Sequence, residues 1–209
     1  TICVKNISLY SVAGIMFYLV GYNLLYGIDE GGYLGSLSMW GGDDSALKAD
    51  TPDFSGGYST GSDWYFQMVF VATAASIVSG TVAERIKLWP FLGFVVLLTA
   101  FIYPIQASWV WGGGWLSAAG FSDFAGSTLV HSVGGWAALV GAILLGARAG
   151  KYGANGSVTP IPGSSMPLAT LGTFILWLGW FGFNGGSQLA LGSAIDAAAV
   201  ADIFINTNM

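Results

Sequence analysis

Charged residues, histidine and cysteine are scarce in this 209-residue sequence. Only 8% of the residues are charged, against 54% hydrophobic, which leaves too few charges to cover the surface of a soluble protein of this size. The single cysteine, Cys3, excludes an internal disulfide, and a thiolate metal site needs several ligands at set spacings. These shortages indicate an integral membrane protein, for which we expect no metal and no cofactor.

What the sequence has in place of charge is a series of long, nearly continuous apolar runs, with 32 glycines overall. The runs lack the apolar-polar alternation of membrane-spanning strands, so spanning helices are favoured over a barrel. Glycines inside the runs favour close approach between helix backbones. We therefore predict an all-α, polytopic membrane protein.

The apolar runs are long enough to cross a bilayer core of about 30 Å. We predict spans at about residues 7–27, 64–82, 90–111, 124–147 and 168–188, and the start of a further helix near 195. These spans form a single partial transmembrane domain. Because the chain opens at Thr1 without methionine or a cleavable signal, and stops at Met209 within a starting helix, we interpret it as a fragment.

The loops between the spans differ in charge. One side carries most of the basic residues, namely Lys5, Arg85, Lys87, Arg148 and Lys151. The positive-inside rule makes this side cytoplasmic, so we place residues 83–89 and 148–166 in the cytoplasm of a cell-membrane protein. Residues 28–63, which are rich in Gly, Ser and Asp, then form an aqueous loop outside.

The only histidine, His131, lies in a stretch from Phe124 to Ala147 that has no charged residue. An ionisable group left bare in hydrocarbon is costly, so the imidazole must be paired, hydrated or facing a cavity. On a helix, Ser127 and Gly135 flank it on the same face and leave room beside the ring. Two interpretations stand: His131 lines a functional cavity, or it bonds to a neighbouring helix and holds the bundle together.

Two helix faces carry aromatic stripes. In the span at 168–188, one face combines two aromatic rings with an amide and a hydroxyl, from Trp180, Phe183, Asn184 and Ser187. This face suits either a lined passage or a polar packing seam. In the span at 64–82, Phe66 and Phe70 are four residues apart, a spacing that fits core packing as well as a gate.

Two further residues have a structural and a functional interpretation. Trp111 ends a span before three glycines, so it is either an aromatic-belt residue or a cation–π platform worth about 0.5 to 2 kcal/mol. Asp123 precedes the His131 helix, where a carboxylate can accept unpaired amide hydrogens at the helix N-terminus.

Four motifs in this order and spacing resemble the ammonium transporter family over nearly the whole chain: AERI at 83–86, VWGGGW at 110–115, DFAGSTLVH at 123–131 and GWFGFNGGS at 179–187. The resemblance implies an eleven-helix fold built from an inverted repeat of five helices, assembled as a homotrimer with a narrow pore through each subunit. This chain would correspond to the second helix through the sixth, plus the first turns of the seventh.

The resemblance also assigns roles to residues of this sequence. It implies an outer ammonium site at Trp111, Ser187 and Phe70, with Phe66 beside it. It implies a phenyl gate of Phe70 and Phe183, a pore lined by Trp180 and His131, and a structural aspartate, Asp123, at the start of the pore helix. A second pore histidine of the family lies on the tenth helix, beyond this sequence, which we attribute to truncation.

The function that the resemblance implies is ammonium transport. An ammonium ion loses water in an apolar pore that cannot replace it, so deprotonation and passage as ammonia would avoid the charge penalty. Expected partners are ammonium, methylammonium and a cytoplasmic nitrogen-regulatory signalling protein, and no nucleic acid. An ammonium sensor and a Rhesus-type ammonia channel remain as alternatives. An enzyme is disfavoured, and no catalytic residue is expected, because a nucleophile with a base, or a metal set, is missing from the apolar spans.

Overall fold

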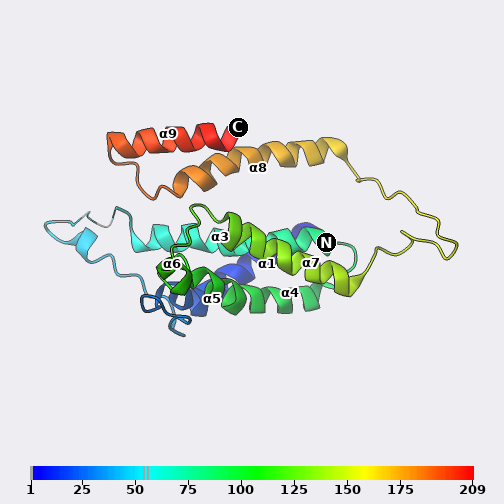
Figure 1. Ribbon diagram of the computed structural model, residues 1–209, viewed down its shortest axis with the longest axis horizontal. Coiled ribbons are helices and arrows are strands. Elements are labelled where there is room, and N and C mark those ends of the chain that lie inside the picture. The colour runs from blue at the N-terminus through cyan, green and yellow to red at the C-terminus, as the bar shows by residue number, and fades with distance from the viewer. Residues whose placement is uncertain (1, 54, 56) are drawn as a thin grey trace. The chain divides into compact units, whose positions relative to one another are not determined.

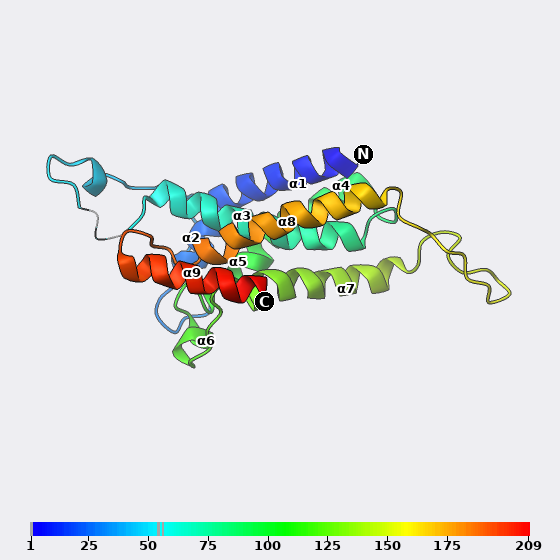
Figure 2. The same cartoon turned by 90° about the horizontal axis from the view of Figure 1, so that it is seen from above.

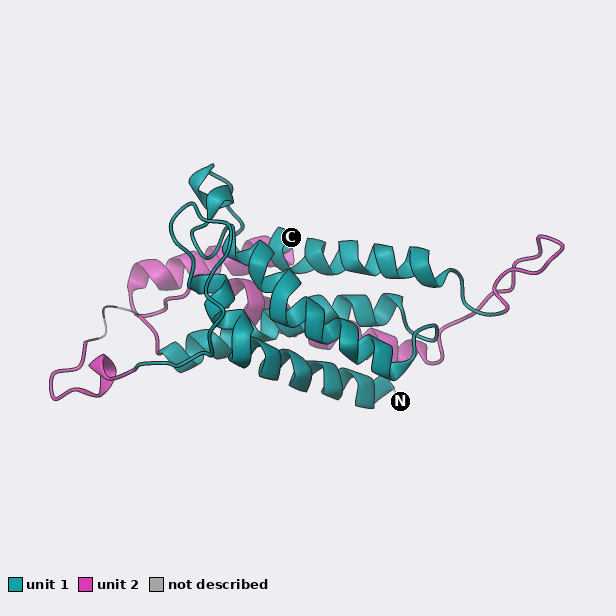
Figure 3. Cartoon of the chain, turned by 90° about the horizontal axis from the view of Figure 1, so that it is seen from below, with its two compact units in different colours: residues 1–43, 60–149 teal, residues 44–59, 150–209 magenta. Residues whose placement is uncertain are grey.

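The described part of the chain, residues 2–53, 55 and 57–209 of a computed structural model, consists of helices joined by loops (Figure 1). Within these residues the extended backbone forms one isolated antiparallel bridge, between Tyr152 and Val158. The expected all-α class is confirmed. Contacts divide the chain into two compact units, residues 1–43 with 60–149 and residues 44–59 with 150–209, which are described separately (Figure 3).

The first unit contains helices in which α-helical and π-helical turns alternate. Two helices have a π-helical segment between α-helical ones. The first consists of α1 (Ile2–Met16), η1 (Phe17–Gly21) and α2 (Tyr22–Tyr26). The second consists of α4 (Leu88–Leu97), η3 (Leu98–Ile102) and α5 (Tyr103–Ser108). The remaining helices are α3 (Thr60–Thr81), the short α6 (Trp115–Ala118), and η4 (Ser127–Ser132) leading into α7 (Val133–Leu145).

Four helical segments among the described residues are long and apolar enough to cross a membrane: Ile2–Tyr26, Leu88–Ser108, Ser127–Leu145 and Met166–Gly186. Helix α3 has 22 residues but is not one of the four, and it carries Gln67 and a polar first turn that ends at Asp63. The membrane span that we predict at 64–82 therefore remains a prediction, supported by the length of α3 alone.

Helix ends depart from the predicted span ends where a turn intervenes. The helix that corresponds to the predicted span at 90–111 ends at Ser108, so Trp111 lies in the turns that follow it. The helix that corresponds to the predicted span at 124–147 begins at Ser127. Gly126 adopts a left-handed φ of 98°, which cannot continue a right-handed helix. The loop predicted at 28–63 ends earlier, where α3 begins at Thr60.

The core of the first unit lies where α3 packs against α1, α4 and α7. Its fully or nearly buried members are Leu9, Ala75, Val78, Val82, Phe91, Val95, Leu98 and Ala138. Glycine lets α7 approach α3 closely, because a Cβ atom at Gly134 would lie 2.9 Å from the carbonyl oxygen of Ala74. The helix that carries His131 is therefore held directly against the helix that carries Phe66 and Phe70.

Basic side chains tie the helices together at the predicted cytoplasmic end. The Arg85 guanidinium donates to the carbonyl of Thr81, in the last turn of α3, and to the carbonyl of Gly146, at the C-terminus of α7. The Lys5 ammonium donates to the carbonyl of Ser79 at 2.9 Å and lies 5.5 Å from the centroid of the Phe91 ring. Each cation thus satisfies carbonyl groups that a helix C-terminus leaves unpaired.

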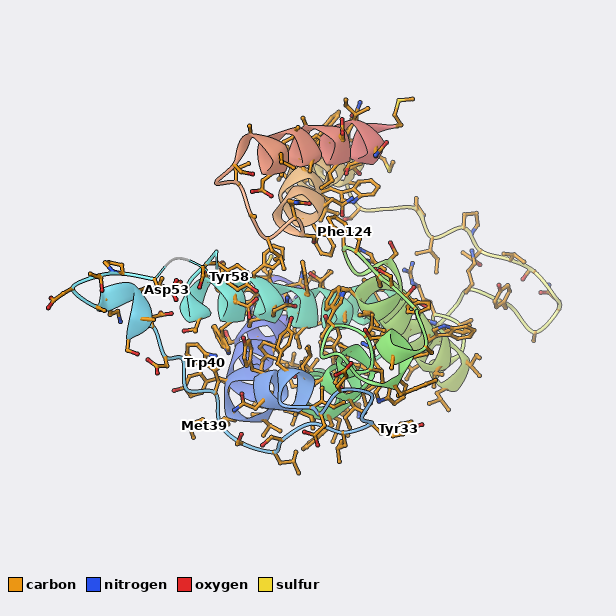
Figure 4. All side chains as sticks on the ribbon, turned by 60° about the vertical axis from the view of Figure 1, so that its left-hand side comes forward. Tyr33, Met39, Trp40, Asp53, Tyr58 and Phe124 are labelled. Carbon is orange, nitrogen blue, oxygen red and sulfur yellow. The ribbon has the colours of Figure 1, made fainter. Side chains whose placement is uncertain are left out.

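The first part of the predicted outer loop is fastened to the helices. The Asn23 amide donates to the carbonyls of Ser38 and Met39, and the backbone N–H of Trp40 donates to the carbonyl of Tyr18. Figure 4 labels Tyr33, Met39 and Trp40 along this segment. These hydrogen bonds place Trp40 against the helices of the first unit.

The described part of the second unit contains the short 3₁₀ helix η2 (Ala46–Lys48) and two longer helices that lie side by side, α8 (Met166–Gly186) and α9 (Ala194–Asn208) (Figure 2). The rings of Phe181 and Phe204 meet edge to face with centroids 5.4 Å apart. Phe204 also covers Gly185, where a Cβ atom would lie 2.4 Å from the ring. The Asn184 amide donates to the Thr207 hydroxyl at 3.0 Å, so aromatic packing and a polar contact both join the helices.

Candidate functional site

Asp123 fixes the N-terminus of the helix that carries His131. Its Oδ1 atom accepts the backbone N–H groups of Gly126 and Ser127, at 2.8 and 3.1 Å. Its Oδ2 atom accepts those of Thr128 and Leu129, both at 2.8 Å. One carboxylate therefore satisfies four amides that a helix N-terminus leaves unpaired, and its charge complements the helix dipole.

The same residue holds Trp111. The indole Nε1–H of Trp111 donates to the backbone carbonyl of Asp123 at 2.7 Å. Gly126 leaves room for the indole, since a Cβ atom there would lie 3.2 Å from Trp111 Cη2. With its N–H engaged, the indole has a fixed ring plane.

Two phenyl rings of α3 lie next to this indole. The Phe70 ring, which is 2% exposed, lies with its centroid 5.8 Å from that of Trp111. The Phe66 ring follows at 4.6 Å from Phe70, in an edge-to-face arrangement. The structure thus brings Phe66, Phe70, Trp111 and Asp123 into one continuous group, which we call the Trp111 group.

His131 lies in the π-helical turn η4, two turns from Asp123. Its backbone N–H donates to the carbonyl of Gly126 at 3.0 Å, and its Nδ1 atom lies 3.3 Å from the same oxygen. Because a carbonyl oxygen only accepts, this contact favours a hydrogen on Nδ1, and in the neutral imidazole Nε2 is then the acceptor. The π-helical turn and the Asp123 cap together set where the imidazole stands on the helix.

The other predicted site residues belong to the second unit. Trp180, Phe183 and Ser187 follow one another along α8 and just past its end. The Ser187 hydroxyl donates to the carbonyl of Phe183 at 2.9 Å. Asn184, which shares their predicted face, is used in packing against α9 through its bond to Thr207.

The predicted residues are therefore divided between the two units. The first unit brings together Phe66, Phe70, Trp111 and Asp123, with His131 on the helix that Asp123 caps. Contacts between this set and the α8 residues stay predictions. Within the described residues, no group of three or more His, Cys, Asp and Glu gathers in a way that could hold a metal ion.

Two supporting residues escaped the sequence analysis. Gly126 is required at the left-handed turn before η4, and its position three residues after a capping aspartate was the available signal. Gln106, a polar residue in an apolar span, donates from Nε2 to the carbonyl of Leu129 at 2.8 Å and joins α5 to η4. Its polarity within the span at 90–111 could have identified it.

Comparison with known proteins places this geometry in context. A family model described as "Ammonium Transporter Family" matches residues 1–209. A putative ammonium transporter of Synechocystis is 42% identical over 205 residues, which are 98% of this chain and 45% of the relative. Ammonium transporter Amt2 of Archaeoglobus fulgidus is 41% identical over 218 residues, covering 100% of this chain and 44% of the relative.

Solved structures show the same likeness. A structure titled "Sensor Amt Protein" superposes with a TM-score of 0.83 and 38% identity, covering 98% of this chain and 49% of that one. Saccharomyces cerevisiae Mep2 superposes with a TM-score of 0.71 and 27% identity, covering 88% of this chain and 40% of that one. The chain spans less than half the length of these curated relatives and corresponds to part of their fold.

Proposed function

The chain belongs to the ammonium transporter family, a family of membrane transporters and not of enzymes, and on this premise we propose that the protein containing it carries ammonium across a cell membrane. Ammonium would be recruited at an outer site, deprotonated there, and conducted as ammonia. The observation that carries this proposal is the Trp111 group, in which one aspartate fixes both an indole and the helix that bears His131.

The outer site would use Trp111 as a cation–π platform. Its N–H is already engaged by Asp123, so the part of the indole left for a ligand is its π face. Such a face attracts a cation by about 0.5 to 2 kcal/mol, more as water is removed. Phe70 and Phe66 pack beside the indole and would exclude water from the bound cation.

Ser187 would supply the hydrogen-bond acceptor of the outer site. Its hydroxyl hydrogen is given to the carbonyl of Phe183, so the oxygen offers lone pairs to a ligand. An ammonium ion has N–H donors to fill them, whereas potassium has none. This arrangement requires α8 to bring Ser187 close to Trp111, and that approach is part of the proposal.

Phe70 and Phe183 would then gate a narrow apolar pore lined by Trp180 and His131. An ammonium ion that loses its water in such a pore meets few groups able to replace it, so neutral ammonia passes at lower cost. A histidine with an acceptor at Nε2 can take a hydrogen bond from ammonia or relay a proton.

We also propose the arrangement of the whole protein. Residues 28–63 would face outward and residues 83–89 and 148–166 the cytoplasm, following the distribution of basic residues. A homotrimer and a cytoplasmic nitrogen-regulatory partner complete the proposal, by likeness to the family. Methylammonium would be a second substrate.

An ammonium sensor is the second candidate function. It is favoured by the likeness to the structure titled "Sensor Amt Protein", at 38% identity over 98% of this chain. In that case the same outer site would report its occupancy to a cytoplasmic output domain. The remaining coding sequence, read for such a domain, discriminates between the two.

Ammonium-dependent current and labelled methylammonium uptake test the proposed function in the full-length protein, reconstituted in lipid membranes. We expect Trp111→Leu and Ser187→Ala to raise the KM of uptake, and His131→Ala to alter the conduction rate. Full-length protein that supports no ammonium flux would contradict transport. Flux with the site intact but unchanged by all three substitutions would contradict the site.

A further inference from the structure

A second aromatic cluster lies at the predicted outer end of the first unit. We call it the outer aromatic cluster, and its rings belong to Phe17, Tyr18, Tyr22, Tyr26, Trp40 and Trp64. Neighbouring rings have centroids between 5.1 and 6.3 Å apart. Trp40 enters from the loop and is labelled in Figure 4. The cluster reaches α3 through Trp64, the residue that follows Asp63.

A carboxylate lies beside this cluster. The Tyr22 hydroxyl donates to Asp63 Oδ2 at 2.5 Å. The ion pair between Glu84 and Arg148 does not involve Asp63, and no cationic side chain pairs with Asp63 among residues 2–53, 55 and 57–209. Burial raises the pKa of the Asp63 carboxyl in spite of the hydrogen bond from Tyr22, as expected where a counter-charge is missing.

The amide of Gln67 adds a second acceptor. Its side chain is 5% exposed, and its Oε1 atom has no hydrogen-bond partner among the described residues. Asp63 and Gln67 are four residues apart on α3, so their side chains are neighbours on one face of the helix. Buried acceptors in native proteins are almost always satisfied, so this oxygen indicates a donor that binds from outside the chain.

We propose that Asp63 and Gln67 form a second cation site, which holds ammonium or methylammonium before it reaches the Trp111 group. This proposal rests on the proposed function. Two acceptor oxygens on one face of α3 match the N–H donors of an ammonium ion, and an aromatic cluster is a favourable neighbour for a cation. Potassium needs a fuller shell of oxygen ligands than these two acceptors supply. The site would raise the local concentration of ammonium at the outer end of α3.

Equilibrium binding of labelled methylammonium to the full-length protein tests the site. Trp111→Leu serves as the background, because it removes the binding site of the proposed function. In that background we expect methylammonium to remain bound, and Asp63→Asn to weaken the remaining binding by about tenfold. Gln67→Leu should weaken it in the same direction, and excess potassium should compete poorly.

Asp50→Asn is the matched control, since it removes an exposed carboxylate of the same predicted outer loop. Asp63→Asn keeps an acceptor for the Tyr22 hydroxyl, so the hydrogen bond that supports the fold can persist. Size-exclusion profiles and melting temperatures check that each variant is folded.

Equal binding by the Asp63→Asn and Asp50→Asn variants in the Trp111→Leu background would overturn the proposal, as would equal competition by potassium. In either case Asp63 has a structural role and is not part of a selective cation site. Such a result leaves the proposed function standing if Trp111→Leu still impairs uptake. Uptake unaffected by Trp111→Leu would instead contradict the outer site of the proposed function and leave the Asp63 binding result to be judged by itself.

Discussion

The indole N–H of Trp111 donates to the backbone carbonyl of Asp123, and the Asp123 side chain accepts four amides at the start of the helix that bears His131. One residue thus sets the orientation of a ring through its main chain and the start of a helix through its side chain. A disturbance at Asp123 is therefore expected to reach both Trp111 and His131.

Replacement of Asp123 by alanine tests this double role. We expect the free energy of unfolding to fall by about 2 kcal/mol or more, because the four amides lose a charged acceptor. Methylammonium uptake should fall as well, since Trp111 and His131 lose their fixed positions. Denaturant unfolding in detergent and uptake in vesicles measure the two effects. Glu30→Ala, on an exposed loop position, is the control, and an equal effect there would contradict the role of Asp123.

Gly126→Ala should destabilise the protein by about 1–3 kcal/mol. The left-handed φ of 98° is unfavourable for alanine, and the new Cβ atom would lie 2.4 Å from Val130 Cγ2. Gly93→Ala, in the interior of α4 with no atom within 4 Å of the new Cβ, should be neutral or stabilising. Melting temperatures compare the two variants, and equal losses would argue against strain at Gly126.

Ser187→Ala should raise the KM for methylammonium about five- to tenfold, as loss of one hydrogen bond of about 1 kcal/mol predicts. The maximal rate should change little, because the hydroxyl is proposed to act in capture and not in conduction. Ser187→Thr keeps the hydroxyl and should restore most of the affinity. A fall in the maximal rate with an unchanged KM would place Ser187 outside the capture step.

Arg85 and Glu84, at the predicted cytoplasmic end, allow the effect of hydrogen-bond geometry to be separated from that of charge. Arg85→Lys should cost about 1–2 kcal/mol of unfolding free energy, because one ammonium cannot reach the carbonyls of both Thr81 and Gly146. Glu84→Gln breaks the Glu84–Arg148 ion pair but should cost less than about 1 kcal/mol, since both side chains are well exposed. Chemical unfolding measures the loss of stability in both variants. A larger loss for Glu84→Gln than for Arg85→Lys would contradict the role given to the two Arg85 hydrogen bonds.

The pH dependence of stability should carry a contribution from Asp63, in the first turn of α3 and outside the predicted span at 64–82. Burial raises the pKa of this carboxyl, so the folded state binds the proton more tightly than the unfolded state does. Its contribution to stability is complete below the ordinary pKa of about 3.9 and is lost as the pH rises through the raised pKa. Unfolding free energies of wild type and Asp63→Asn across this window should diverge as the pH rises, and parallel curves would contradict the shift.

Local patterns account for much of what the sequence revealed about the site. The capping position of Asp123, and the placement of His131 within a charge-free helix, depend on residues only a few positions away in the chain. Periodicity also put Asn184 on a face with Phe183 and Ser187. It could not show that Asn184 bonds to Thr207, because that partner lies 23 residues away on α9.

Run length, scarcity of charge and four motifs were by themselves enough to establish that this chain is a helical membrane protein of the ammonium transporter family. These properties follow from the chemistry of single segments, which have to cross a membrane whatever they pack against. Tertiary structure alone decided that the Trp111 indole is held by the Asp123 carbonyl, and that Tyr22 meets Asp63 across 41 residues of chain. Such pairings depend on how closely helix backbones approach and in which register, and no periodic pattern encodes either quantity.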